Sequence, residues 1–277
     1  METNENKIYN PPKPVMKYGG YKGSARGRRY TVLSMILVAL LWFFSARAIG
    51  RSLILPDFVE TMRAFIGSWI DPYVLENLAT TLKRVFTGLM YATLIGFPLG
   101  LLTGYFPTLL GAVSPYIDSI RQIPIMAWVP LSIIWFGLGD GPTIFMITMS
   151  AVFPILINTI QGVRGIDPNY RFAAETMGAS TGQVFTDVII PGSFPSFLIG
   201  FRTAIGTAWS SVICAEFIAT SSGFGFLMVE AQVRMQTPQL YALMIMSAIV
   251  GYSMDRIIVL IEKYSTRWRF KNGAFES

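Results

Sequence analysis

Histidine is absent from this 277-residue chain, and cysteine occurs once, at Cys214. Without histidine, the Ser-His and Cys-His nucleophiles of the common hydrolases cannot form. A single thiol excludes an intramolecular disulfide, and the two shortages together exclude the usual Cys/His metal sites. The chain also lacks a G-x-x-x-x-G-K-[ST] phosphate loop, so it does not bind ATP in that way itself. We therefore predict a non-catalytic chain without a metal or cofactor of its own.

Charged residues are also scarce, at 14% of the chain against about 25% in soluble domains. Hydrophobic residues make up 52%, which predicts a membrane protein. The net charge of +6 is concentrated at the ends, because residues 1–30 hold seven Lys or Arg and a second basic cluster follows residue 262. Basic segments beside membrane spans favour the cytoplasm, so we expect both termini there and an even number of spans. The sequence shows no basic face on a soluble module, which is the feature that would indicate nucleic-acid binding.

Long apolar runs predict an all-α polytopic membrane protein with six transmembrane helices in the lipid bilayer. They lie at about residues 30–49, 78–105, 115–136, 143–163, 195–219 and 240–261. The Pro- and Gly-containing segment before them is typical of a flexible cytoplasmic arm. Apolar residues at helical spacing after the first run predict an amphipathic helix along the outer membrane surface. These features divide the chain into residues 1–29, 30–76, 77–268 and 269–277, the last a cytoplasmic tail.

The second apolar run carries two features of its own. Gly96, Gly100 and Gly104 place a small residue at every fourth position, which permits close approach of another helix. That helix belongs either to the same subunit or to a dimer partner. Lys83 and Arg84 lie in the first turns of the run, where we expect their charges to reach the outer interface.

Residues 163–195 form the longest charge-bearing interruption in the second half of the chain. Asp167 has the position of a helix N-cap, and Gly178 is expected to end that helix about ten residues later. Ser180 followed by Gln183 has the spacing of a capping box and opens a second helix, which we expect to stop before Pro191. The stretch therefore predicts a compact pair of capped helices, suited to pass force between a membrane domain and a soluble partner.

This stretch resembles the EAA loop of ABC importer permeases, whose pattern is Glu-Ala-Ala, three residues, Gly, nine residues, Ile, one residue, Leu-Pro. Ala173, Ala174, Gly178 and Pro191 keep the spacing, while Phe172 replaces the acid. From about residue 77 to 268 the chain resembles the nitrate/sulfonate/taurine branch of that family. The short segments on which this resemblance rests, each given with the number of its first residue, are IRQIP (120), AWVPL (127), WFG (135), FPILINT (153), GFR (200), AE (215) and SGFG (222).

The resemblance implies the type I fold of ABC importer permeases, with a cytoplasmic coupling loop at about residues 164–191. It also implies a bacterial plasma-membrane transporter of two permeases and two cytoplasmic ATPase subunits, which bind the ATP and Mg, and an external substrate-binding protein. A homodimer is expected, and a heterodimer with a second, different permease stays open. The residues expected to contact the ATPase are Asp167, Phe172, Ala173, Ala174, Met177, Gly178 and Pro191.

Polar and amphipathic side chains inside the predicted spans are candidates to line the translocation path, but such residues also hydrogen-bond between helices. They are Arg121, Trp128, Trp135, Asn158, Arg202, Thr207, Trp209 and Ser210. Arg202 either attracts an anionic substrate or pairs with Asp118, Glu216 or helix-end carbonyls. The residues expected near the outer mouth, to shape the gate or contact the binding protein, are Glu216, Gly223 and Gly225.

The function predicted from the sequence is that of the permease subunit of an ATP-driven importer for a small anion of the sulfonate, taurine or nitrate class. Two alternatives stay open at this point. One is a permease of the same family for an aromatic or vitamin-precursor substrate. The other is a stand-alone channel or ion-coupled carrier, which needs no ATPase partner.

Overall fold

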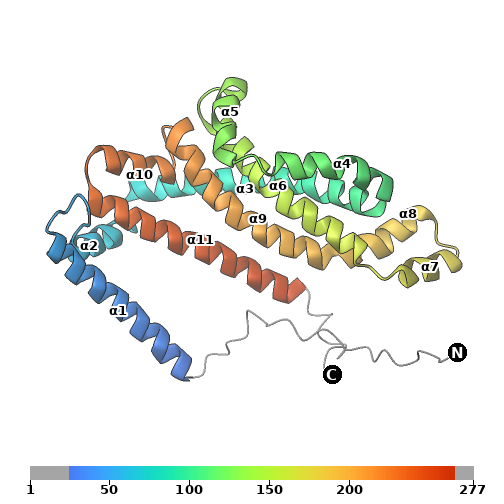
Figure 1. Cartoon of the computed structure of the whole chain (residues 1–277), viewed down its shortest axis with the longest axis horizontal. Helices are drawn as coiled ribbons and strands as arrows, with labels where there is room; N and C mark the ends of the chain where they lie inside the picture. The colour runs from blue at the N-terminus through green and yellow to red at the C-terminus, as the bar shows by residue number, and fades with distance from the viewer. Residues whose placement is uncertain (1–24, 266–277) are drawn as a thin grey trace, which may run out of the picture. The chain divides into compact units, whose positions relative to one another are not determined.

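The computed structural model describes residues 25–265, which are almost entirely helical and contain no β-strand (Figure 1). The all-α prediction is therefore confirmed for this part of the chain. The predicted arm before residue 25 and the basic tail after residue 265 lie outside the described residues. The helices are α1 (Ala25–Ile49), α2 (Phe58–Ser68), α3 (Pro72–Tyr105), α4 (Pro107–Ile120), η1 (Ile125–Trp128), α5 (Val129–Phe136), α6 (Asp140–Arg164), α7 (Pro168–Thr176), α8 (Thr181–Val184), η2 (Phe185–Ile189), α9 (Ile190–Ala219), α10 (Phe224–Val233) and α11 (Thr237–Ser265).

Five helical runs in the described chain are long and apolar enough to cross a membrane. They are α1 from Arg29, α3, α6, the continuous run from α8 through α9, and α11 up to Glu262. The helices on either side of Gln122 together meet the same test but are bent by 89°, the geometry of a broken span or of a re-entrant loop. The expected number of six is reached when this bent pair counts as one span.

The chain divides into two compact units after Gly50. The first contains α1, whose apolar side chains are mostly exposed, as in a helix that faces lipid. The second contains α2 to α11. Its α2 is the amphipathic helix that the sequence predicts, and Asp57 caps it by accepting the backbone N–H groups of Val59 and Glu60.

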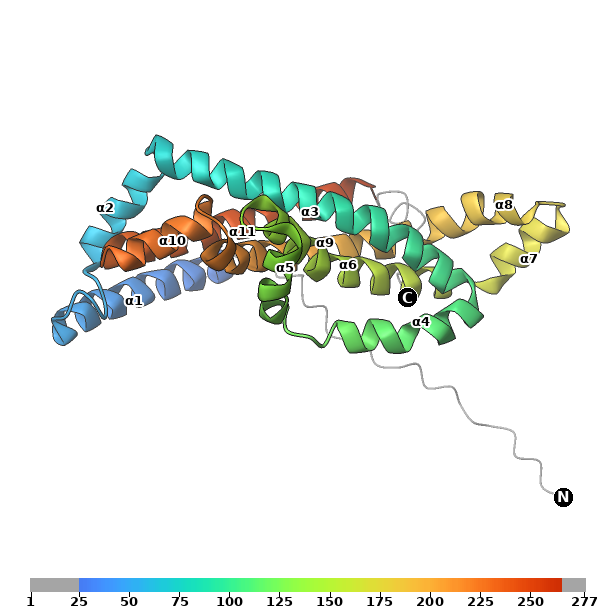
Figure 2. The same cartoon turned by 90° about the horizontal axis from the view of Figure 1, so that it is seen from above.

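The second unit is built around α6, which packs along most of its length against α3 and against α9 (Figure 2). Glycines of α3 lie against α6 at a constant offset along the chain, so these two helices run parallel and in register. The contacts are Gly88 with Ile147, Gly96 with Ile155, Gly100 with Thr159 and Gly104 with Val163. The row of small residues in α3 therefore serves packing within the subunit, and α9 runs antiparallel to both helices.

The third predicted span is not a continuous helix. The expected turn at residues 106–114 is already helical as the start of α4, and the helix stops at Ile120. Pro124 lacks an N–H group and disfavours helical geometry at Ile123, so the chain breaks there and restarts as η1 and α5. Figure 1 shows α5 turned out of the bundle, across the direction of the long helices.

Two further sequence predictions were wrong in detail. Pro191 does not follow the end of a helix, because α8 passes through the π-helical turn η2 directly into α9, which accepts Pro191 in its first turn. A π turn widens the helix and removes the need for the hydrogen bond that proline cannot make. The predicted outer loop at 221–238 contains a helix, α10, which follows the left-handed Gly223.

Candidate functional site

The segment between α6 and α9 forms two short helices, α7 and α8, that extend beyond the ends of the core helices (Figure 1). Asp167 caps α7 by accepting a backbone N–H group at 2.9 Å. Gly178 ends the helix in the left-handed region at φ +86°. Ser180 and Gln183 form the reciprocal capping box that opens α8. The predicted N-cap, left-handed glycine and capping box are confirmed, whereas the predicted helix stop before Pro191 is wrong.

Large apolar side chains of this segment face outward. Phe172 and Met177 are 59% and 81% exposed, whereas Ala174 and Val184 turn inward and pack near Leu101 at the end of the core. Arg171 holds the start of α7 in place. Its Nε donates to Glu175 at 2.9 Å, which raises the pKa of Arg171, and its guanidinium stacks over the Tyr105 ring. A rigid, capped pair of helices thus presents an apolar face, which is suited to contact another protein.

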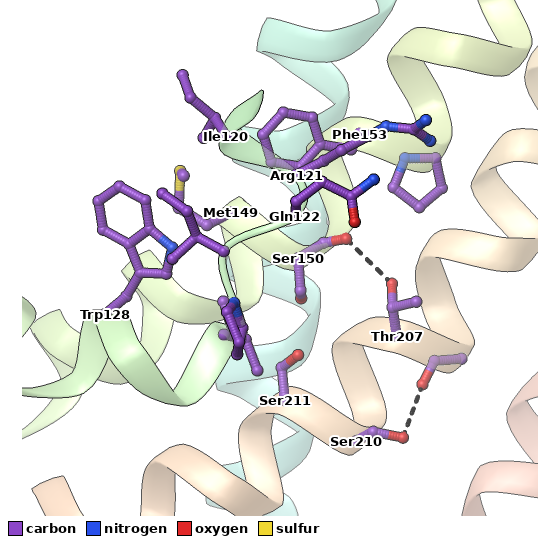
Figure 3. Close-up of a pocket in the computed structure, with 15 residues that line it drawn as sticks. Ile120, Arg121, Gln122, Trp128, Met149, Ser150, Phe153, Thr207, Ser210 and Ser211 are labelled. Carbon is purple, nitrogen blue, oxygen red and sulfur yellow. Dashed lines mark hydrogen bonds between the residues drawn. The ribbon is translucent and has the colours of Figure 1, made fainter. Parts of the chain in front are cut away.

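A pocket with a volume of about 510 Å³ opens where the broken span meets the middle of α6 and α9 (Figure 3). The break between α4 and η1 forms one wall. The residues that line the pocket are Ile120, Arg121, Gln122, Ile123, Pro124, Ile125, Trp128, Met149, Ser150, Phe153, Pro154, Gly206, Thr207, Ser210 and Ser211. The proline that breaks the span therefore also creates the pocket.

Arg121 is the one charged residue among those that line the pocket. Its Nε lies 3.0 Å from Asp118 Oδ1 one turn earlier in α4. Gln122 adds an amide, and the facing walls add the hydroxyl groups of Thr207 and Ser210 (Figure 3). Ser150 and Ser211 also line the pocket, and most of the remaining lining residues are aromatic or aliphatic. The pocket is thus suited to a small ligand with one anionic group and an apolar part.

A buried ionic cluster joins the opposite end of the core. Arg84 of α3 is 4% exposed, and its Nη1 donates to the fully buried carboxylate of Glu216 in α9 at 2.7 Å. Nε donates to Asp140, the first residue of α6, and the remaining bonds go to Ser222. The Glu216 carboxylate also accepts the hydroxyl of Thr81 and a backbone N–H of α10. Every charge in this cluster is paired, as burial requires.

Residues 96–267 match the family described as binding-protein-dependent transport system inner membrane component. An ABC transporter permease protein of Methanocaldococcus jannaschii is 37% identical over 242 residues, which cover 84% of this chain and 89% of that protein. The chain belongs to this permease family. The taurine transport system permease protein of Escherichia coli is 30% identical to it over 238 residues, 84% of this chain and 86% of that protein.

The fold agrees with this assignment. A solved inward-facing structure of the MetNI methionine ABC transporter matches with a TM-score of 0.56, covering 68% of this chain and 96% of that chain at 19% identity. The protein is therefore a multi-pass ABC importer permease, with the fold of that class. The family assignment removes the alternative of a stand-alone channel or carrier.

The permease brings together four of the eight residues predicted to line its path: Arg121, Trp128, Thr207 and Ser210. The other four lie outside the pocket. Trp135 is exposed beside Phe145, and the Asn158 amide donates to a carbonyl in its own helix. Trp209 is buried against α11, and Arg202 pairs with Asp255.

The three residues expected at the outer mouth belong to the buried ionic cluster. Glu216, Gly223 and Gly225 are all buried, so in this structure they shape the segment before α10 and present no surface to a partner. A side chain at Gly223, which has φ +111°, would collide with the Glu216 carboxylate. The glycines are therefore required by the close approach of backbone and carboxylate.

Sequence analysis missed Arg84 and Asp140 as members of this cluster. The expectation that Arg84 reaches the membrane interface was wrong, because its guanidinium is buried. A signal was available. An arginine in one apolar helix and a glutamate in another each need a partner at membrane depth, but Arg202 was the partner considered for Glu216.

Proposed function

We propose that this permease imports a small organic anion of the sulfonate class through the pocket at the break between α4 and α5. The observation that carries the proposal is the lone charged residue of the lining, Arg121, set among hydroxyl groups and aromatic rings. The name of the taurine permease supports the same class of ligand. Taurine carries a sulfonate, which a guanidinium binds through two hydrogen bonds.

A second copy of the chain is the proposed cover of this pocket. Irregular backbone at membrane depth is tolerated only where protein or a water-filled cavity surrounds it. Here the break at 121–124 and the half-exposed Arg121 lie on the open side of the bundle. The neighbouring α5 exposes large apolar side chains, with Ile134 at 77%. A homodimer would cover both features and leave the two pockets facing one shared path.

The exposed face of α7 and α8 is the proposed docking site for a cytoplasmic ATPase. This assignment puts the α7 end of the second unit in the cytoplasm. The α10 end then faces an external binding protein that delivers the substrate. ATP and Mg bind to the ATPase in this scheme, since the permease has no phosphate loop. Nucleotide-driven motion of the docked subunit would switch the pocket between two exposures.

Uptake by proteoliposomes tests the substrate class. The permease is reconstituted with its ATPase and binding protein, and ATP-dependent uptake of radiolabelled taurine is measured. Arg121→Gln removes a charge-assisted contact with the substrate. Loss of about 1.4 kcal/mol of binding free energy is expected to raise the KM about tenfold. Arg256→Gln, which changes an exposed arginine of α11 outside the pocket, is the matched control. Equal KM values for wild type and Arg121→Gln, or uptake of uncharged substrates alone, would overturn the proposal.

A further inference from the structure

Arg202 and Asp255 connect α9 to α11 inside the apolar part of both helices. Nε of Arg202 lies 2.8 Å from one carboxylate oxygen of Asp255, and Nη2 lies 3.2 Å from the other. Two parallel hydrogen bonds of this kind fix the orientation of the helices as well as their distance. Neither of the two carboxylates considered from the sequence is involved, because Asp118 pairs with Arg121 and Glu216 with Arg84.

A second contact lies on the same faces of the two helices. Gly251 of α11 approaches the Trp209 indole so closely that a methyl group there would lie 2.8 Å from the ring. Trp209 is seven residues after Arg202, and Asp255 is four residues after Gly251, so each pair shares one helix face. The helices therefore touch at Gly251, and the ion pair holds them together on the side nearer α7.

α9 is continuous with the proposed coupling segment. The helical run from Thr181 to Ala219 includes α8, the π turn and α9 without a break. α6 packs along most of α9, whereas α11 contacts it much less. Motion that enters at α8 therefore reaches α9 directly, while its transfer to α11 depends on a small number of contacts.

The membrane makes this ion pair costly to separate. A lone charge near the bilayer centre costs at least about 2.5 kcal/mol on insertion scales. Arg202 and Asp255 are 42% and 36% exposed, so each depends on the other to offset that cost. The pair lies outside the pocket, which argues against a substrate contact.

We propose that the Arg202–Asp255 pair is a mechanical link that makes α11 follow α9 when the ATPase moves α7 and α8. This inference rests on the proposed docking role of α7 and α8. Arg202 is then a positioning residue, acting through Asp255, and its charge serves the coupling of ATP hydrolysis to transport.

The test measures substrate transported per ATP hydrolysed in proteoliposomes for Arg202→Gln, for Asp255→Asn and for the exchange Arg202→Asp with Asp255→Arg. Each single variant is expected to keep the stimulation of ATPase activity by the loaded binding protein. The number of substrate molecules transported per ATP is expected to fall about five- to tenfold, which is the low end of the coupling factors found between two sites of a protein. The exchange restores opposite charges and is expected to recover the ratio. Arg256→Gln, which removes an exposed charge that lies over Tyr252 in the same helix as Asp255, is the matched control.

Three results would overturn the link. They are a normal ratio in both single variants, failure of the exchange to recover it, and a raised KM in the Arg202 variants alone, which would indicate substrate binding. If the single variants do not accumulate in membranes, Arg202→Met with Asp255→Met removes both charges and is expected to accumulate with the same low ratio. If no ATPase co-purifies with the wild type, the proposed docking role fails instead, so the two failures are distinguishable.

Discussion

The charged guanidinium of Arg84 is tolerated in the apolar interior because each of its three nitrogens donates a hydrogen bond to an acceptor. Removing one partner of such a pair leaves the other charged and buried, which costs about 3–5 kcal/mol. The cluster joins α3, α6, α9 and the segment before α10, so this cost falls on the whole α10 end.

Arg84→Met is therefore expected to lower the stability of the permease by about 3–5 kcal/mol, because it strands the Glu216 carboxylate. The measurement is the thermal midpoint of the detergent-purified protein, followed by fluorescence-detected size exclusion. Arg234→Met breaks an exposed pair with Glu230 and is expected to change stability by about 0–1 kcal/mol. Equal midpoints for the two variants would show that the buried pair is not needed.

At the residue scale, the predictable features are those that depend on neighbours in sequence. Asp167 and the Ser180–Gln183 box were predicted correctly because a cap and its N–H group lie within three residues of each other. The bond between Arg84 and Glu216 spans 132 positions, and no local pattern encodes it. The pairing of Arg202 was left open for the same reason.

At the scale of the helices, α3 and α6 approach each other closely, and the glycines of α3 set their distance. A methyl group at Gly100 would lie 2.6 Å from Thr159 Cβ, closer than two carbons pack. Gly100→Ala is therefore expected to force the helices apart and lower stability by about 1–3 kcal/mol. Gly111→Ala in α4, where nothing lies within 4 Å, is the control and is expected to be neutral or stabilising. The thermal midpoints of the two variants measure the difference, and an unchanged midpoint for Gly100→Ala would contradict the contact.

The turn between α7 and α8 depends on one left-handed glycine. Gly178→Asp strains this turn and adds a charge beside the exposed Met177, so we expect loss of ATPase binding and of uptake, with normal amounts of permease in the membrane. The measurements are an immunoblot of membranes, co-purification of the ATPase and substrate uptake. Gly67→Asp in α2, with open space around it, is the control. Normal uptake by Gly178→Asp would count against a docking role.

Helix positions followed from apolar run length, but helix breaks did not. Pro124 breaks its span and Pro191 does not, although both lie in apolar sequence. A π turn directly precedes Pro191 and widens the helix there, whereas the residues before Pro124 form an open turn. That accommodation depends on packing against neighbouring helices, so sequence periodicity does not reveal it.

For the whole molecule, the proposed homodimer places α5 of each copy at the interface. In a cysteine-free background made by Cys214→Ser, Ile134→Cys is expected to crosslink two permeases in native membranes when a short bifunctional thiol reagent is added. Val233→Cys in α10, equally exposed but on a different face, is the control and is expected to crosslink weakly. Equal crosslinking of both variants would contradict the proposed interface.

The unbroken run from Thr181 to Ala219 has 39 residues, which gives a rod of about 58 Å at 1.5 Å per residue. The hydrocarbon layer is only about 30 Å thick, so roughly half of this rod stands in water or among headgroups. A docked ATPase would therefore meet the permease well clear of the lipid surface. Its affinity is expected to be insensitive to the fraction of anionic lipid in the membrane.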